Sequence, residues 1–381
     1  MNTLRNALRG AAAVLAATVV TAGLAAAAIA LLDLPFSLLP AVLVAAVGGP
    51  ASLTSSIDTG FLPVALQGTV DVVPLGIAGP GAVVFAVVLL GSLRTPLRAL
   101  AVRTAGAAGT AVVVLAVLST AKSTSIDIPL PLDGTPLPTE AQLVIQPDGG
   151  SAVFTGLLAL LVLAAGCALL TRLPYRRTVA ATALAGPVVL IAVGLAVAAV
   201  VATRQPALAG VALLFGANAV LLAVLAAFGA SSLTSVGGPL AQVLDSVAGR
   251  DVWLLGGVAP GPLRVAGVLM FVLVCTVALT LVTPEVGNRW RRAGGQALVA
   301  GTVLAVVLAV TAMIGAGSLD LGVSLAVFRT PLLALRFEPA VGWALLAGVV
   351  TGGLAGLAGS LTADVRWRAQ QRLIRRIRAY G

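Results

Sequence analysis

The chain has 381 residues, of which 59% are hydrophobic and 9% are charged, and its mean hydropathy is +1.10. A soluble protein carries more charge on its surface, so this composition predicts an integral membrane protein with no room for a large soluble domain. The net charge of +10 does not predict nucleic-acid binding, because the arginines stand in short clusters between apolar runs. No histidine is present, and Cys167 and Cys275 lie inside apolar runs, so we expect no metal site, no cofactor and no disulfide.

Apolar runs of the length that crosses a bilayer, about 20 residues, recur along the chain. The sequence therefore predicts an all-α polytopic membrane protein. The first run has 22 residues, which is long for a secretory signal peptide, and a similar run follows Arg176 and Arg177, so we expect the first run to remain as a helix. The runs lie at 11–32, 80–93, 104–121, 152–171, 179–203, 207–230, 265–282, 294–316 and 340–361.

Clusters of basic residues between these runs predict the orientation, because cytoplasmic loops of membrane proteins are rich in arginine and lysine. Placing every cluster inside leaves most of the acidic residues outside, and it puts both the N-terminus and the C-terminus in the cytoplasm. The clusters are Arg5/Arg9, Arg94/Arg98/Arg103, Arg172/Arg176/Arg177, Arg289/Arg291/Arg292 and the arginines of 366–378.

This orientation requires an even number of crossings between successive clusters, yet each half of the chain holds one extra apolar piece. We expect the middle pieces, 36–48 and 207–230, to enter and leave on the outer side as broken or re-entrant elements. Pro35 and Pro40 interrupt the first piece, and Gly216-Ala217-Asn218 lies within the second. The alternative is that two further segments also cross the membrane, and these are 61–78 and 239–260.

Short patterns occur twice, about 180 residues apart. ASLTS (51–55) matches SSLTS (231–235), and DVVPLGIAGPG (71–81) matches DVWLLGGVAPG (251–261). Further matches are RTAGAAG (103–109) with RRAGGQA (291–297), SIDI (125–128) with SLDL (318–321), and Pro147 with Pro339.

These matches predict two repeats of the same orientation, 1–175 and 176–361, followed by a tail at 362–381. We expect about four transmembrane helices and one broken element in each repeat. A long outer loop at 122–150 has its counterpart at 317–339. Alternation of apolar and polar residues in 317–339 and in QLVIQ (142–146) predicts short strands or an outer hairpin that lies on the membrane surface.

Polar side chains in the repeated motifs are the candidate binding residues. The hydroxyl groups either line a polar path or act in turns and caps. Asp71 and Asp251 either form a paired site for a cation or polar substrate or, as we favour, cap helices. Asn218 either meets a substrate at a helix break or, as we favour, bonds across helices. The hydroxyl candidates are Ser52, Thr54, Ser55, Ser232, Thr234 and Ser235.

The tail DVRWRAQQRLIRRIRAY (364–380) places apolar residues between arginines. This pattern is typical of a basic amphipathic helix on the anionic inner leaflet, so membrane lipids are the expected partners and a cytoplasmic protein is the alternative. The arginines that would contact the leaflet are Arg366, Arg368, Arg372, Arg375, Arg376 and Arg378.

Several stretches resemble the streptophobe family of very hydrophobic actinobacterial membrane proteins. The resemblance implies a multi-pass protein of a bacterial plasma membrane, and it transfers no activity and no functional residue. A second similarity, to PerM-like actinobacterial membrane proteins linked to cell division, rests on PLG followed by an apolar helix and arginine. The stretches similar to the streptophobe family are PLGIAGPGAVVFAVVLLGSLR (74–94), RTAG (103–106), ALAGVALLFGAN (207–218) and VGWALLAGVVTGGLAGLAGSL (341–361).

The residues that catalysis needs are missing from the expected places. No charged residue lies in the middle of an apolar run, no phosphate loop with lysine is present, and no nucleophile and base have a recognisable spacing, so we expect no enzyme.

Two functions stay open. The first is a transporter-like or channel-like core for a small neutral or lipid-like molecule. The second is an accessory or scaffold protein that packs against partner membrane proteins or a second copy, which the small-residue face GVVTGGLAGLAG (348–359) favours.

Overall fold

The computed structural model provides the structure for most of the chain. The described residues are 2–58, 63–92, 95–120, 123–129, 140–172, 176–227, 233–237, 261–282, 289–325, 328–338 and 340–380.

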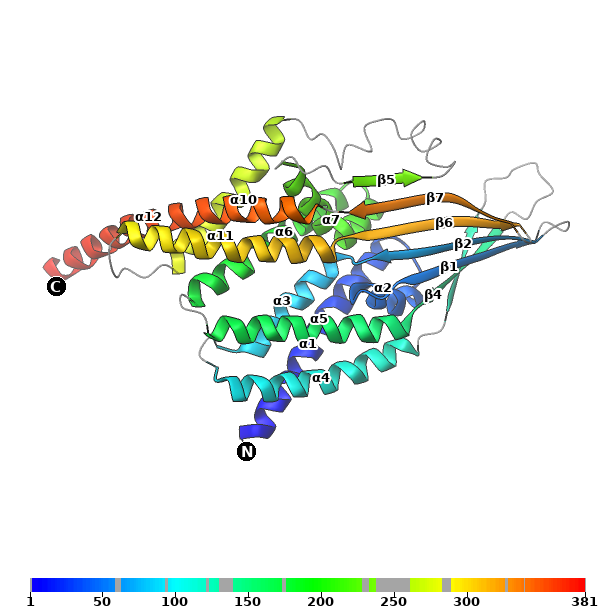
Figure 1. The fold of residues 1–381 in the computed structure, drawn as a ribbon, viewed down its shortest axis with the longest axis horizontal. Coiled ribbons are helices and arrows are strands. Elements are labelled where there is room, and N and C mark those ends of the chain that lie inside the picture. Colours follow the sequence, from blue (N-terminus) through cyan, green and yellow to red (C-terminus); the bar gives the residue numbers. More distant parts are fainter. Residues whose placement is uncertain are drawn as a thin grey trace.

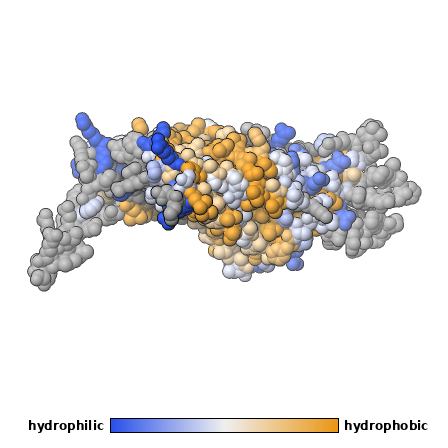
Figure 2. Space-filling view, turned by 90° about the horizontal axis from the view of Figure 1, so that it is seen from below, coloured by the Kyte–Doolittle hydropathy of each residue, from blue (hydrophilic) through white to orange (hydrophobic). Residues whose placement is uncertain are grey.

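Six helices are long and apolar enough to cross a membrane, which confirms the predicted multi-pass membrane protein. Leucine and valine side chains on these helices point outward, and Leu298 and Val200 are 73% and 68% exposed. Figure 2 shows an apolar band across the middle of the molecule, with hydrophilic residues toward both ends. Such a surface suits a bilayer, because exposing it to water would cost free energy. The six helices are α1 (Asn2–Leu31), α4 (Leu97–Ser119), α5 (Gly149–Arg172), α6 (Arg176–Ala202), α11 (Arg289–Ile314) and α12 (Val341–Tyr380).

The middle pieces of the two halves differ from each other. The first is a 3-10 turn, Phe36–Leu38, followed by the eight-residue helix α2 (Leu39–Ala46). Pro40 stands in the first turn of α2, where a missing N–H costs nothing, so it starts a helix and does not interrupt one. The second is the 22-residue helix α7 (Pro206–Ala227). Because α7 runs without interruption through 216–218, the predicted break there is wrong.

Helix α7 stays at one end of the bundle along its whole length. Gly210 packs against the last turn of α1, and Leu213 packs against the first turn of α3 (Leu75–Leu90). Leu221 lies beside Gly315, just after the end of α11. All three of these helix ends face the side of the bundle where the strands begin. Helix α7 therefore lies across that end. Helix α10 (Gly261–Val282) also contacts α7.

A seven-stranded antiparallel sheet rises from this end of the bundle, and both chain termini lie at the opposite end (Figure 1). Its strand order is β3-β4-β1-β2-β6-β7-β5. Strands β4, β6 and β7 confirm the strands predicted at 142–146 and 317–339. Strands β1 and β2 were not predicted, so the all-α class describes the bundle but not the sheet. The strands are β1 (Ala51–Asp58), β2 (Pro63–Val72), β3 (Thr124–Pro129), β4 (Glu140–Pro147), β5 (Leu233–Gly237), β6 (Gly317–Leu325) and β7 (Phe328–Glu338).

Helices and strands follow the same order in the two halves of the chain. The β3–β4 and β6–β7 hairpins also share their register, since Ser125 lies opposite Val144 just as Ser318 lies opposite Arg336. The two orders are α1, α2, β1, β2, α3, α4, β3, β4, α5 and α6, α7, β5, α10, α11, β6, β7, α12, and residues 238–260, between β5 and α10, lie outside the described residues.

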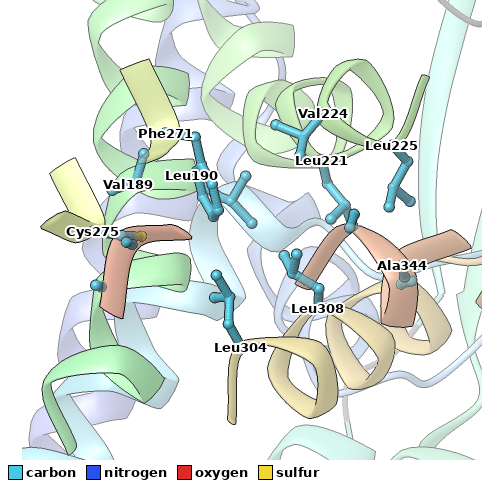
Figure 3. Close-up of a cluster of buried hydrophobic side chains, with 14 of the residues drawn as sticks. Val189, Leu190, Leu221, Val224, Leu225, Phe271, Cys275, Leu304, Leu308 and Ala344 are labelled. Carbon is cyan, nitrogen blue, oxygen red and sulfur yellow. The ribbon is translucent and has the colours of Figure 1, made fainter. Parts of the chain in front are cut away.

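The interior between the helices of the second half is filled with aliphatic side chains (Figure 3). Leu190 of α6, Leu221 of α7, Cys275 of α10 and Leu304 of α11 meet there, and each is at most 3% exposed. Leu75, at the start of α3, joins the same cluster from the first half. This cluster therefore belongs mainly to the second half, and Leu75 is its contact with the first half.

The small-residue face of α12 packs inside the molecule. Gly348, Gly352 and Gly356 lie directly against the α11 backbone, beside Ala305 and Ala300 among others. A side chain at these glycines would clash with that backbone. The predicted small-residue face is therefore covered by α11 and is not an open groove for a partner. Helix α12 continues through the basic tail to Tyr380 and projects beyond the bundle (Figure 1).

Candidate functional site

The sheet has one apolar face and one polar face. Alternation of side chains within each strand and the observed register put aliphatic residues from five strands on one face. Each of these side chains is half-buried, and among the described helices only α2 contacts the sheet to any extent, at β4. Most of the apolar face is thus without a helical cover in the described part of the chain. Its residues are Leu53, Leu66, Val70, Ile126, Leu143, Ile145, Leu319, Leu321 and Val323.

Polar residues form two rows on the opposite face, close to the helical bundle. In one row Gln146, Ser52, Thr69 and Asp320 lie side by side on β4, β1, β2 and β6. In the next row Asp71 of β2 is followed by Ser318 and Arg336 on β6 and β7, and the backbone of Ser235 on β5 pairs with that of Arg336. The sheet thereby places Ser52 and Asp71, two of the predicted candidates, on the neighbouring strands β1 and β2.

A cavity of about 500 Å³ opens at the base of this polar face. The Ser52 hydroxyl donates a hydrogen bond to the carbonyl oxygen of Gln146 over 3.2 Å at its wall. The cavity offers hydroxyl and amide groups where the sheet meets the helices, so it suits a small polar group. Its lining residues are Pro50, Ala51, Ser52, Thr69, Gln146, Pro147, Asp148 and Gly149.

The Asp148 carboxylate at this cavity is engaged in capping α5. It accepts hydrogen bonds from the backbone N–H groups of Gly150 and Ser151, at 3.0 and 3.2 Å, and from the Ser151 hydroxyl at 3.0 Å. The backbone and hydroxyl bonds of Ser151, with a smaller contribution from Gly150, lower the pKa of Asp148. Asp148 therefore stabilises a helix N-terminus.

Asn218 performs the capping role that was expected of Asp71. Asp71 is exposed in β2, and no side chain caps α3 from within its own segment. Instead, Asn218 Oδ1 accepts a hydrogen bond from the N–H of Leu75 over 2.9 Å. Asn218 Nδ2 donates one to the carbonyl oxygen of Val73 over 3.0 Å. Asn218 is 9% exposed, so its amide joins α7 to the junction of β2 and α3.

The repeated serine and threonine motifs pair differently with their neighbouring strands in the two halves. Ser55 lies on the apolar face, is 5% exposed, and its Oγ atom has no hydrogen-bond partner. Thr54 is exposed on the polar face. In β5 the register is offset by one, because Thr234 is opposite Phe337 and Ser235 is opposite Arg336. The backbone pairing of the two motifs therefore differs by one residue.

The roles of Ser232, of Asp251 and of the arginines of the tail remain predictions. Ser232 and Asp251 lie outside the described residues. The arginines of the tail lie on α12, which continues as one helix to Tyr380.

Sequence reasoning missed the role of Arg103, which it assigned only to a cytoplasmic cluster. The side chain is 5% exposed, and its Nη1 donates to the carbonyl oxygens of Leu89 and Leu90 at 2.8 and 2.7 Å. Its Nε donates to Oδ1 of Asn6 over 3.2 Å. A cation is favourable at the C-terminal end of a helix, here α3, so Arg103 ties α4 to α3 and α1. The sequence signal was a lone arginine seven residues into a helix.

No group of histidine, cysteine, aspartate and glutamate residues that could hold a metal ion occurs among the described residues. Comparison with protein families, with curated proteins and with solved structures finds no match. The sheet and its cavity therefore carry the functional argument by themselves.

Proposed function

We propose that this chain is a non-enzymatic accessory protein of the membrane, in which the helical bundle is the anchor and the sheet is the surface that binds a partner membrane protein. One observation carries the proposal, namely the apolar face of the sheet that no described helix covers beyond the base of β4. A contiguous apolar surface of this kind is typical of an interaction site.

The size of this face follows from the five strands that form it. Five strands spaced about 4.8 Å apart give a width of roughly 19 Å, and eight residues at about 3.3 Å give a length of roughly 26 Å. The face thus covers on the order of 500 Å². This lies in the upper part of the range for the largest apolar patch of an ordinary monomer, about 300–600 Å², which is often functional, and below the roughly 800 Å² that a standard interface buries on each partner.

The orientation proposed here puts the sheet outside a bacterial plasma membrane and both termini in the cytoplasm. Its support is the position of the basic residues. Arg5, Arg98, Arg172 and Arg289 all belong to helix ends that face away from the strands, as the order of elements requires. Cytoplasmic ends of membrane helices carry such arginines. The tail arginines, on the same side, would meet the anionic inner leaflet.

Two parallel repeats, 1–175 and 176–361, complete the proposal. The shared order of elements and the shared register of the two hairpins support it. Under this arrangement eight helices cross, and α2 and α7 stay on the outer side. The likeness of four stretches to the streptophobe family fits the same arrangement, and it adds no activity.

A transporter-like core is the second candidate. The observation in its favour is that α7 stays at the sheet side, as α2, between α1 and β1, does in the first half. Against it stands the aliphatic cluster around Leu190, Leu221 and Leu304, which fills the interior between the helices of the second half. We therefore place the binding surface on the sheet.

Site-specific photo-crosslinking in living cells tests the proposal. A photoreactive residue at Leu321 reports on the apolar face, and one at Gln67 is the matched control, since both positions are half-buried on neighbouring strands but face opposite sides. We expect a discrete protein adduct from Leu321 and none from Gln67. Lipid adducts alone, or equal adducts from both faces, would refute a protein-docking face.

A further inference from the structure

The cavity at the base of the polar face is not used by the proposed docking role, which rests on the opposite face of the sheet. Its volume of about 500 Å³ lies within the range of about 300–1,000 Å³ that is typical of small-molecule sites. Its lining comes from β1, β2 and β4 and from the start of α5. Helix α5 is long and apolar enough to cross the membrane, and its first residue, Gly149, lines the cavity, so the cavity lies at the membrane surface.

Donors and acceptors of hydrogen bonds stand next to each other along one wall of this cavity. In the register of the sheet Ser52 of β1 lies between Gln146 of β4 and Thr69 of β2, so the three side chains form a row on the polar face. The Ser52 hydroxyl donates its proton to the backbone carbonyl of Gln146, and the lone pairs of its oxygen stay as acceptors. The Thr69 hydroxyl and the Gln146 amide can each donate and accept, and both residues are exposed.

Asp148 is the charged residue among the described residues that line the cavity, and its own helix already compensates its charge. Its Oδ1 atom accepts the N–H groups of Gly150 and Ser151, and its Oδ2 atom accepts the Ser151 hydroxyl. A carboxylate has about four acceptor positions, so one position on Oδ2 is left for a ligand. Because the first N–H groups of α5 are bonded to Asp148, the helix N-terminus does not provide an anion site. The lining therefore favours a ligand without net charge.

The second half of the chain starts its closing helix without a carboxylate. Pro147 matches Pro339 in the repeated pattern, so Asp148 matches Ala340. Helix α12 begins directly after Ala340, and the N–H of Ala344 bonds to the carbonyl oxygen of Ala340 over 3.1 Å. Starting a helix at this junction thus does not depend on an aspartate. The carboxylate beside the cavity is a feature of the first half alone.

We propose that this cavity binds a neutral, polyhydroxylated molecule, of which a single sugar ring is the simplest form. The hydroxyl groups of a sugar both donate and accept, which matches the row of hydroxyl and amide groups and the open position on Asp148. The C–H faces of a sugar ring are apolar, which matches Pro50 and Pro147 in the same lining. At the membrane surface such a ring comes either free from solution or as the headgroup of a glycolipid.

Saturation-transfer NMR on the full chain in lipid nanodiscs tests the inference for free sugars. The neutral probes are glucose, galactose, mannose and N-acetylglucosamine, and the charged probes are glucose 6-phosphate and glucosamine. Gln146→Leu and Thr69→Val remove polar groups of the lining at similar volume. Gln67→Leu is the matched control, since Gln67 lies on the polar face of β2 but not in the lining. We expect a neutral sugar to bind, with an affinity about three- to tenfold lower in the two lining variants and unchanged in the control.

Native mass spectrometry of the same proteins, released from nanodiscs that contain monoglucosyl-diacylglycerol, tests the headgroup as the source. We expect wild type and Gln67→Leu to retain this lipid and Gln146→Leu to lose it if the sugar comes from a lipid. Binding in either experiment supports the inference and identifies the source. The inference is overturned if no neutral sugar binds in either experiment, if a charged probe binds as tightly as the neutral sugars, or if Gln67→Leu loses as much binding as Gln146→Leu. Melting temperatures confirm that the variants compared are folded.

Discussion

Replacing Asn218 by leucine tests how the two halves are held together. The side chain is 9% exposed on α7, and its two hydrogen bonds, 2.9 Å to the N–H of Leu75 and 3.0 Å to the carbonyl oxygen of Val73, are the ones described at the junction of β2 with α3. Leucine fills a similar volume and makes neither bond. The N–H group of Leu75 and the carbonyl group of Val73 would then be left without partners in an apolar surrounding.

The expected cost follows from these two groups. A buried polar group that loses its partner costs about 1–3 kcal/mol, and the loss of a helix cap costs about 0.5–2 kcal/mol. The N–H of Leu75 contributes to both of these costs, so the two costs are not simply added. We expect Asn218→Leu to lower the free energy of unfolding by about 2–4 kcal/mol. Leu208→Ala on the same helix is the control, since Leu208 is 53% exposed on the surface and its truncation changes stability little.

Two measurements on protein in detergent micelles decide the matter. Thermal unfolding followed by tryptophan fluorescence reports the change in stability, and hydrogen exchange reports the protection of the amide of Leu75. We expect a lower melting temperature and faster exchange for Asn218→Leu only. Unchanged stability together with unchanged exchange would mean that the Asn218 side chain does not stabilise the fold. Asn218 would then again be a candidate binding residue.

Three further substitutions probe the sheet, the helix packing and the α5 cap. Ser55→Ala removes a buried hydroxyl without a partner, so it should stabilise the protein by about 1 kcal/mol in thermal unfolding, and a loss of stability would reveal a hidden partner. Gly352→Leu forces a side chain against the backbone of α11 and should destabilise the protein by at least about 1–3 kcal/mol, whereas the same change at Gly294, which has open space, should cost far less. Asp148 has a lowered folded pKa, so its cap stabilises the fold above the ordinary pKa of about 4 and is lost as pH falls through the lower folded pKa. Melting temperatures measured between pH 6 and about pH 3 should therefore fall more steeply for the wild-type protein than for Asp148→Asn, and parallel curves would contradict the assignment.

Hydropathy was sufficient to predict the long helices, because crossing a bilayer imposes a length and a composition on a single continuous segment. The strands β6 and β7 were also predictable, since their alternation is visible in 317–339. Strand β1 was missed for a local reason. Serine and threonine in ASLTSSID indicate turns and caps as readily as strands, and Ser55 interrupts the apolar face that would have revealed the period of two.

The candidate site was harder to predict, because it is formed by contacts between distant segments. Asn218 and Leu75 are 143 positions apart, so no local pattern indicates that one caps the other. The row that joins Asp71 to Ser318 and Arg336 depends on the order of strands, and that order depends on the junction of β2 with β6. The repeated motifs did not indicate the backbone pairing of β5, in which Thr234 is opposite Phe337.

Cysteine accessibility in intact cells is the measurement that tests most directly whether the sheet, and not the core, meets the outside. Single cysteines at Thr54, which is exposed on the polar face, and at Leu221, in the core, are treated with a small membrane-impermeant thiol reagent in the background without Cys167 and Cys275. We predict rapid labelling at position 54 and none at position 221. Labelling at position 221 from outside would reveal a wet path into the interior of the second half, and it would replace the docking account with a transporter.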